Sequence, residues 1–214
     1  MLNFYLALYY MLFIGDTTWE EDNMMMTAIL EEIEFYSGSE STKLKMNCGM
    51  RDSGRMLWGW TWKGFLKKDK ETGENVMRTP SRFKGLYNTK IVDEYPELED
   101  IFYEFAEKYF GDFDFDSVQM TKNFEIMTHK DKKNIGDSVV CGFGYYTGGE
   151  LVIKGDTWQK LINEDDYKHN IQEKFVKFNG YENYHYVMPF EGTRYSLVFF
   201  SQHKSLIPRG VEKN

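Results

Sequence analysis

Residues 138–153 read SVVCGFGYYTGGELVI, and this stretch decides the fold class. Ser138 to Tyr146 predicts a strand, Thr147-Gly148-Gly149 a turn, and Glu150 to Ile153 the returning strand. The same alternation of short apolar runs and turns continues toward the C-terminus, with strands expected at 175–178, 184–188 and 194–200. Short strands separated by Gly-rich turns favour an antiparallel jelly-roll sandwich over a βαβ fold.

The N-terminal half of the chain has helical patterns. Met24 to Ile33 carries apolar residues at helical spacing, and Thr17 or Thr18 could cap its start. Pro96 to Phe110 predicts an amphipathic helix that Gly111 closes. The fold class we expect is therefore α+β with a mainly β core, a jelly roll supported by N-terminal helices.

The bulk composition is that of a globular protein. The chain has 214 residues, of which 42% are hydrophobic and 28% charged, so one domain spanning 1–214 is the simplest organisation. The apolar run at 2–14 is interrupted by Asn3, follows no basic residue and is shorter than the roughly 20 residues of a membrane span. We expect an intracellular protein (cytoplasm or nucleus), with no signal peptide, transmembrane helix or membrane partner. The two cysteines form no CxxC pair and are expected to be reduced.

The net charge of −8 does not by itself indicate a nucleic-acid partner, but residues 43–90 carry 12 Lys and Arg against four acids. Trp58-Gly59-Trp60-Thr61-Trp62 alternates within this segment, which predicts a strand with three indoles on one face. Basic groups interleaved with aromatic ones suit single strands or flipped bases. The alternative is an amphipathic strand whose Trp face is core. The residues we expect to contact a substrate are Trp58, Trp60, Lys67, Lys68 and Arg82.

The stretch from Met127 to Ser138 holds the candidate metal ligands. If it is a strand end, the two-residue period points His129 and Asp131 to the same face. Two histidines and one carboxylate, with the opposite positions open, are the ligands of non-haem Fe(II) oxygenases. Of the other three histidines, His203 lies near a polar tail and His169 in a charged, surface-like stretch. His185, on a strand next to a hairpin, is the best third ligand.

Arg194 opens the last strand, and Ser196 follows on the same face. A buried guanidinium needs an anion, and its fork suits a carboxylate held through two hydrogen bonds. A structural ion pair with Glu191 or Glu150 is the alternative.

Four elements in order resemble the Fe(II)/2-oxoglutarate dioxygenase superfamily over roughly residues 115–201. They are His129-Lys130-Asp131, Gly148-Gly149-Glu150-Leu151, His185, and Gly192-Thr193-Arg194-Tyr195-Ser196. The resemblance implies a double-stranded β-helix at 115–201. Residues 1–110 would then supply helices, the basic aromatic segment and a substrate wall.

The resemblance further implies a division of roles within the site. His129, Asp131 and His185 would hold Fe(II), and Arg194 with Ser196 would bind 2-oxoglutarate, with O₂ as the other cosubstrate. Asn134 would bind cosubstrate or substrate, or else support the site or a turn. Such an enzyme hydroxylates a C–H bond.

Asn134, Gly136 and Ser138, together with the Gly-x-Arg-Tyr-Ser ending, are similar to the TET/JBP-like nucleobase oxygenases. This finer resemblance implies that the substrate is the methyl group of thymine or 5-methylcytosine in DNA, held through the basic segment at 43–90. Two alternatives stay open at this point. One is a protein (prolyl-type) or small-metabolite hydroxylase, and the other is a non-catalytic, cupin-like metal-binding protein.

Overall fold

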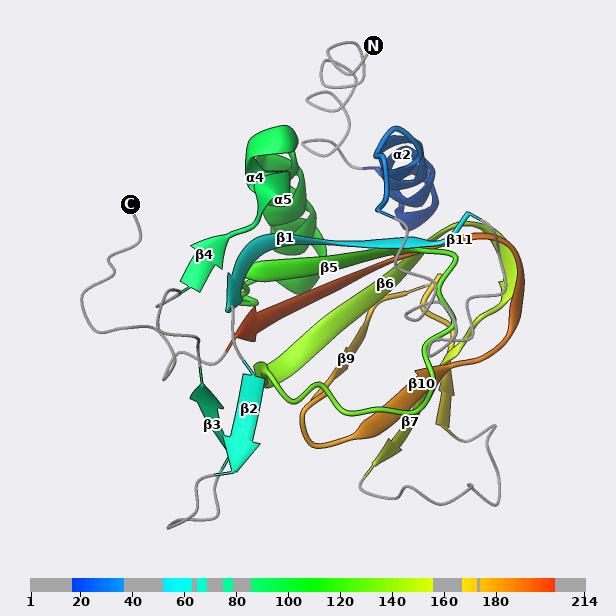
Figure 1. The fold of residues 1–214 in the computed structure, drawn as a ribbon. Helices are drawn as coiled ribbons and strands as arrows, with labels where there is room; N and C mark the ends of the chain where they lie inside the picture. The colour runs from blue at the N-terminus through cyan, green and yellow to red at the C-terminus, as the bar shows by residue number, and fades with distance from the viewer. Residues whose placement is uncertain are drawn as a thin grey trace.

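The computed structural model describes residues 17–36, 52–62, 65–68, 75–78, 86–155, 167–172 and 174–202 (Figure 1). The predictions for residues 1–14, for Arg82 and for His203 lie outside these ranges. Of the strands at 65–68, 75–78 and 86–88, the structure describes the backbone alone.

Two antiparallel sheets form the body of the described chain. The larger sheet has the strand order β4-β1-β5-β11-β6-β9 and the smaller one β10-β7-β8. The larger sheet consists of β1 (Gly54–Trp62), β4 (Leu86–Asn88), β5 (Ser117–Lys122), β6 (Asn134–Gly148), β9 (Val176–Phe178) and β11 (Phe190–Gln202). The smaller sheet consists of β7 (Leu151–Gly155), β8 (Lys168–His169) and β10 (Tyr184–Val187). A separate hairpin pairs β2 (Phe65–Lys68) with β3 (Asn75–Arg78).

This arrangement confirms the predicted fold class. The chain leaves the larger sheet at the end of β6, passes through the Gly148-Gly149 turn and enters the smaller sheet as β7. The predicted strands of this region are all present, and β6 and β11 are longer than their sequence patterns indicated. The protein therefore has an α+β fold with a jelly-roll, double-stranded β-helix core.

Three helices lie on one face of the larger sheet, and β7 and β10 lie on the other (Figure 1). They are α2 (Trp19–Glu31), α4 (Lys90–Glu94) and α5 (Leu98–Phe110). Thr18 caps α2 in a capping box with Glu21, as its sequence position predicted. Gly111 follows α5 as its C-cap. None of the described helices is long and apolar enough to cross a membrane.

The two-residue period of β11 divides its side chains between two layers. Tyr195, Leu197 and Phe199 are buried in the core beneath the helices. Arg194, Ser196, Val198 and Phe200 line a cavity on the opposite face. β6 behaves alike, with Val139, Cys141 and Phe143 under the helices and Val140 on the cavity. The sheet thus separates a hydrophobic core from a partly polar cavity.

Trp58 belongs to the core and not to the cavity, which speaks against the substrate contact expected for it. Its side chain is 4% exposed and packs edge-on against Phe102 of α5, with ring centroids 5.4 Å apart. Gly59, between Trp58 and Trp60, has φ +90°. A Cβ there would lie 2.2 Å from the carbonyl oxygen of Asp116, so only glycine fits. Trp60 is half-buried and does not line the cavity around Arg194.

A buried ionic cluster joins α2 to α5. The Asp22 carboxylate is 0% exposed. It accepts hydrogen bonds from Lys108 Nζ at 2.5 Å, Tyr109 Oη at 2.5 Å and Thr17 Oγ1 at 2.6 Å. Burial and the bond to Asp22 both raise the pKa of Tyr109. Because every donor points at one carboxylate, Asp22 fixes the distance between the two helices.

Asp22→Ala is expected to lower the free energy of unfolding by about 3 kcal/mol, since it leaves the largely buried Lys108 ammonium without its counter-charge. Urea denaturation followed by circular dichroism measures this loss. Tyr36→Phe is the control, because it removes a hydroxyl bonded to a carboxylate, that of Glu94, at an exposed position. An Asp22→Ala midpoint equal to that of the control would show that the cluster does not stabilise the fold.

Candidate metal centre

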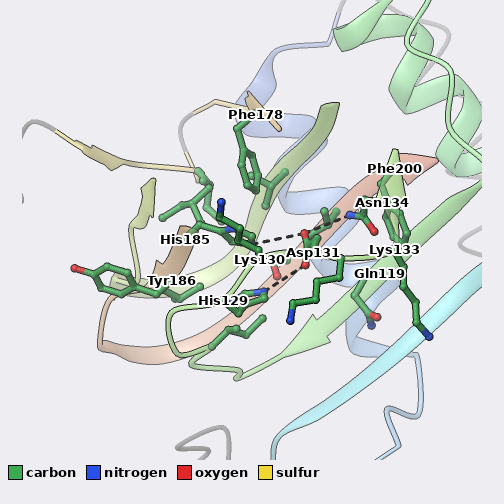
Figure 2. Close-up of a pocket in the computed structure, with 18 of the residues that line it drawn as sticks. Gln119, His129, Lys130, Asp131, Lys133, Asn134, Phe178, His185, Tyr186 and Phe200 are labelled. Atoms are coloured by element: carbon green, nitrogen blue, oxygen red, sulfur yellow. Dashed lines mark hydrogen bonds and ion pairs between the residues drawn. The ribbon is translucent and has the colours of Figure 1, made fainter. Parts of the chain in front are cut away.

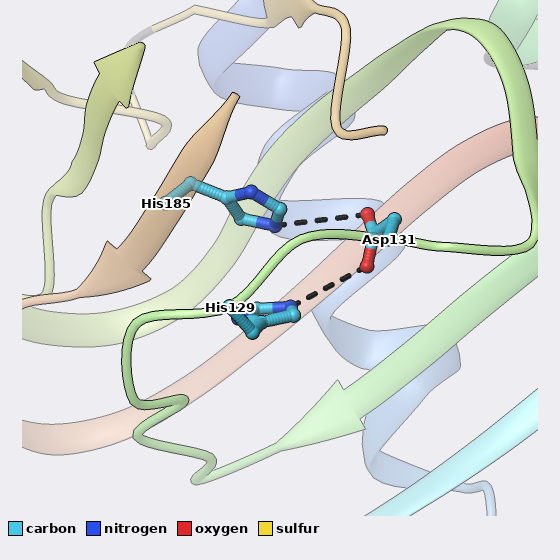
Figure 3. Close-up of side chains that lie close together, drawn as sticks. All are labelled: His129, Asp131 and His185. Carbon is cyan, nitrogen blue, oxygen red and sulfur yellow. Dashed lines mark ion pairs between the residues drawn. The ribbon is translucent and has the colours of Figure 1, made fainter. Parts of the chain in front are cut away.

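Three side chains that can ligate a metal converge between the sheets. The ligand atoms of His129, Asp131 and His185 all lie within 4.8 Å of one another (Figure 3). His129 Nε2 is 3.4 Å from Asp131 Oδ1, and His185 Nε2 is 3.6 Å from Asp131 Oδ2. Two ligand atoms bound at right angles to one metal at about 2.1 Å lie about 3 Å apart. The spacing found here is therefore close to that of a metal site.

The two histidines face each other through the backbone. His129 and His185 exchange two N–H···O=C hydrogen bonds of 3.0 Å each, and their rings lie 4.2 Å apart. His185 is on β10, but His129 and Asp131 lie on the connection between β5 and β6. The expectation of a strand end is therefore wrong, and a single bridge to β10 aligns His129 instead.

Both imidazole rings are oriented by a carbonyl two residues earlier in the chain. His129 Nδ1 lies 2.9 Å from the carbonyl oxygen of Met127, and His185 Nδ1 lies 3.0 Å from that of Asn183. A carbonyl only accepts, so Nδ1 is the donor in each ring, and in the neutral form of either ring Nε2 holds the lone pair. Both lone pairs belong to nitrogens that face Asp131, as a metal between the three groups requires (Figure 3).

The two rings differ in their protonation. Burial lowers the pKa of His129, but the hydrogen bond and negative charge of Asp131 outweigh this, so the net pKa is raised. Burial also lowers the pKa of His185, and there the carboxylate offsets only part of the effect. The ring of His185 is 5% exposed and lies edge-on to Phe178 at 4.9 Å. The pKa values of the two rings are therefore shifted in opposite directions.

Two neighbours hold the Asp131 carboxylate. Asn134 Nδ2 donates to Asp131 Oδ2 and to Ser138 Oγ, both at 3.3 Å. The backbone N–H of Asp131 donates to the carbonyl of Gly180 at 2.8 Å. A Cβ at Gly180 would lie 2.6 Å from Asp131 Oδ2. Asn134 thus supports the carboxylate, one of the roles considered for it, and Gly180 leaves the room that the carboxylate occupies.

Arg194 lines the same cavity as the three ligands and is 1% exposed. Its guanidinium carbon lies 5.5 Å from the Tyr146 ring and 5.6 Å from the Phe190 ring. Neither Arg194 Nε nor the Tyr146 hydroxyl has a hydrogen-bond partner among the described residues. Burial lowers the pKa of Arg194, and Tyr146 offsets part of this effect. A buried cation in this state is costly unless an anion joins it.

The alternative of a structural ion pair finds no support in the described part of the chain. Glu150 and Glu191 are both described, and neither forms an ion pair with Arg194. The Ser196 hydroxyl shares a 2.6 Å hydrogen bond with Thr121 Oγ1 and lines the cavity beside Arg194. The guanidinium and its neighbouring hydroxyl therefore line the cavity without an ion pair, although the charge of Glu150 offsets part of the lowering of the Arg194 pKa.

Two residues position Arg194, and one of them, Asn123, was missed from the sequence. Asn123 binds both backbone groups of Arg194. Its Oδ1 accepts from Arg194 N at 2.9 Å, and its own N–H donates to Arg194 O at 2.7 Å. Asn123 has φ +51°, a conformation that asparagine tolerates better than most residues. Gly149, at φ +71°, has no Cβ to approach Arg194 Nε at 2.9 Å, which gives the second glycine of the Gly-Gly pair its physical reason.

The cavity has a volume of about 430 Å³ (Figure 2), within the range of small-molecule sites. Its apolar wall comes from both sheets and includes Val140, Leu151, Ile171, Phe178 and Val198. Of the residues predicted to contact substrate, Lys67 and Lys68 lie on β2, where the structure describes the backbone only. Their role, like that of Arg82, stays a prediction.

No protein-family profile matches this chain, and no curated protein matches it. Solved structures similar to it include NgTET1 in complex with 5mC DNA, with 14% identity, a TM-score of 0.40, and coverage of 78% of this chain and 67% of the other. OsALKBH1 is similar at 15% identity and a TM-score of 0.42, covering 85% and 93%. A prolyl-4-hydroxylase from Pseudomonas putida follows at 17% identity and a TM-score of 0.32, covering 70% of both chains. Each is a distant likeness, and the chemistry of this chain is argued from its own residues.

Gly180→Ala is expected to weaken divalent-metal binding about 10- to 100-fold, because the added methyl group displaces the Asp131 carboxylate without removing any ligand. The backbone at Gly180 is not left-handed, so alanine itself causes no strain there. Isothermal titration with Fe(II) or Co(II) under anaerobic conditions measures the change.

Gly111→Ala is the matched control. It replaces a glycine at φ +60° with open space around it, so it strains the backbone far from the metal ligands. Equal metal affinity in Gly180→Ala and Gly111→Ala would show that Gly180 does not position Asp131.

Proposed function

We propose that this protein is an Fe(II)- and 2-oxoglutarate-dependent oxygenase that hydroxylates a C–H bond. One observation carries the proposal. His129, Asp131 and His185 share a cavity with Arg194, a buried cation whose Nε has no partner among the described residues. The two histidines and the carboxylate suit a metal with open coordination positions. The Arg194 guanidinium suits the carboxylate of an acid whose other end binds that metal.

The donor set favours iron over a structural zinc site. Structural zinc is normally closed by four protein ligands, often with cysteine among them. Here the described residues bring together two imidazoles and one carboxylate, and Cys141 is buried in the core under the helices. Two histidines and a carboxylate leave positions for two cosubstrates, which a site with only a structural role does not need.

Each part of the site has a distinct task. His129, Asp131 and His185 would hold Fe(II), while Asn134 and Gly180 keep the carboxylate in place. Arg194 would bind the distal carboxylate of 2-oxoglutarate, with Ser196 beside it. The apolar wall keeps water away from the reacting atoms. When bound, Fe(II) with 2-oxoglutarate and O₂ supplies the oxidising power: one oxygen atom enters the succinate formed with CO₂, and the other enters the substrate as hydroxyl.

We further propose that the substrate is a nucleobase in DNA, and that the reacting group is the methyl of thymine or 5-methylcytosine. The support is the resemblance of the Asn134-Gly136-Ser138 pattern and of the Gly192 to Ser196 ending to the nucleobase oxygenases. The 12 basic residues at 43–90 provide charge for a phosphate backbone. A base must leave its duplex to reach a cavity between two sheets, which favours a flipped base or a single strand.

Anaerobic addition of Fe(II) and 2-oxoglutarate is expected to produce a metal-to-ligand charge-transfer band in the visible spectrum. His129→Ala should abolish it by removing a metal ligand. Arg194→Lys should raise the 2-oxoglutarate concentration needed for half of the band at least 10-fold, because lysine keeps the charge and loses the two-pronged contact.

His169→Ala is the control, since it removes a histidine of β8 that is not part of the triad. An unchanged band in His129→Ala, or metal retained with oxidation activity in Asp131→Ala, would contradict the ligand assignment.

Succinate release is expected to rise on addition of 5-methylcytosine or thymine oligonucleotides more than on addition of peptides. Lys67→Glu/Lys68→Glu should weaken DNA binding about 10-fold or more, because two phosphate contacts become repulsions. Fluorescence anisotropy measures binding, and uncoupled 2-oxoglutarate turnover should stay the same. Stimulation by peptides alone would point instead to a protein hydroxylase, and unchanged DNA affinity would leave β2 without a role in binding.

A further inference from the structure

The connection that carries two of the three metal ligands is also the most basic part of the cavity lining. Lys130 lies between His129 and Asp131, and Lys132 and Lys133 follow directly. All three lysines line the cavity, and Figure 2 labels Lys130 and Lys133 there. The lysines are therefore held at the metal site itself and not on a distant face.

The charge of this cavity is opposite to that of the whole chain. Its lining contains Lys130, Lys132, Lys133 and Arg194 against the single carboxylate of Asp131, while the chain carries a net charge of −8. A bound divalent metal would make the cavity more positive still. Such a concentration of charge in a cleft attracts anions and speeds their association.

The lysines do not all have the same freedom. Lys130 is half-buried, and its ammonium lies 4.6 Å from the centre of the Tyr184 ring. Lys132 and Lys133 are exposed, and neither forms an ion pair or side-chain hydrogen bond with the described residues. Lys130 thus packs against the protein, whereas Lys132 and Lys133 present their charge to whatever enters.

A short turn ties these two lysines to the metal ligand. The Lys132 N–H donates to the Lys130 carbonyl at 3.1 Å, and the Asn134 N–H donates to the Asp131 carbonyl at 3.1 Å. The turn ends where β6 begins, at Asn134. The backbone of the two lysines is thus tied to that of Asp131, so their ammonium groups stay within side-chain reach of the metal ligands.

Arg194 and the two exposed lysines are charged groups of different burial in one cavity. Arg194 is 1% exposed, whereas Lys132 and Lys133 are exposed. The same cavity also has an apolar lining, with Ile126, Phe178 and Val187 among its members. A substrate that fits has an apolar, flat part for the cavity and an anionic group outside it. A nucleotide unit of a strand has this form, its base being inside and its phosphates outside.

We propose that Lys132 and Lys133 bind backbone phosphates of the nucleic-acid strand whose base enters the cavity. This rests on the proposed function and deepens it, because it assigns the strand contact to the metal-ligand connection itself and not only to residues 43–90. The contact is to phosphate and carries no base preference of its own.

Lys132→Glu/Lys133→Glu is the test, and Lys174→Glu/Lys177→Glu is the matched control with the same change of charge. Lys174 precedes β9 and Lys177 is on β9, both are exposed, and neither lines the cavity. The probe is a fluorescent single-stranded oligonucleotide with one 5-methylcytosine, measured by anisotropy at several salt concentrations. The Lys132→Glu/Lys133→Glu variant should bind the oligonucleotide at least 10-fold more weakly. Its plot of log affinity against log salt concentration should be less steep by about 1.4, the change expected when two phosphate contacts to a single strand are lost. The control should stay within about 2-fold of the parent protein.

Anaerobic Fe(II) and 2-oxoglutarate binding, followed through the charge-transfer band, separates this inference from the proposed function. An unchanged band with weaker strand binding in Lys132→Glu/Lys133→Glu supports the inference. An unchanged band with strand affinity equal to the control overturns it and leaves the oxygenase proposal standing. A third outcome also overturns the inference. In it the parent protein binds a methylated mononucleotide but not the oligonucleotide, and Lys132→Glu/Lys133→Glu weakens the binding of the mononucleotide. The anion would then be that of a free nucleotide. Absence of the band in the parent protein contradicts the proposed function instead.

Discussion

The structure depends on the antiparallel pairing of β11 with β6, which runs from Phe190 opposite Gly148 to Gln202 opposite Asn134. Because side chains alternate across a strand, this one ladder presents an apolar face to the helices and a mixed face to the cavity. Tyr195, Leu197 and Phe199 anchor the ladder in the core. Their positions leave Arg194 and Ser196 no alternative but to face inward. A slip of one residue would exchange the two sets and bury the wrong side chains in both layers.

That constraint explains how the protein tolerates a buried guanidinium. The ladder places Arg194 at depth, Asn123 holds its backbone on both sides, and the missing Cβ of Gly149 makes room for its Nε. The aromatic rings of Tyr146 and Phe190 contact its flat face, which is a favourable but weak substitute for water. Several residues thus keep a cation at a place where no carboxylate of the described chain forms an ion pair with it. A buried cation that is held in place without an ion-pair partner is typical of a binding site and not of a structural ion pair.

The sequence predicted which side chains lie together better than it predicted their local geometry. The choice of His185 among four histidines and the expectation that Arg194 faces inward agree with a cavity that contains both. His129 and Asp131 do not lie on the strand assumed for them. A single backbone bridge between His129 and His185 aligns His129 instead. Asn123 and Gly180 were not predicted, since their contacts join residues far apart in the sequence. Trp58 follows the alternative considered for the basic segment, because it packs against Phe102 of α5 in the core and not on the cavity.

The carbonyls of Met127 and Asn183 have a consequence for metal selection. Each lies two residues before the histidine that it orients, so both rings are aligned by their own chain segments before any ion arrives. Pre-oriented ligands fix the geometry that the site offers, but two imidazoles and one carboxylate accept several divalent metals. The occupancy of the site then follows the intrinsic ranking of divalent metals for nitrogen and oxygen donors, together with their supply. The identity of the working metal would be set by the environment in which the protein folds, and not by the protein alone.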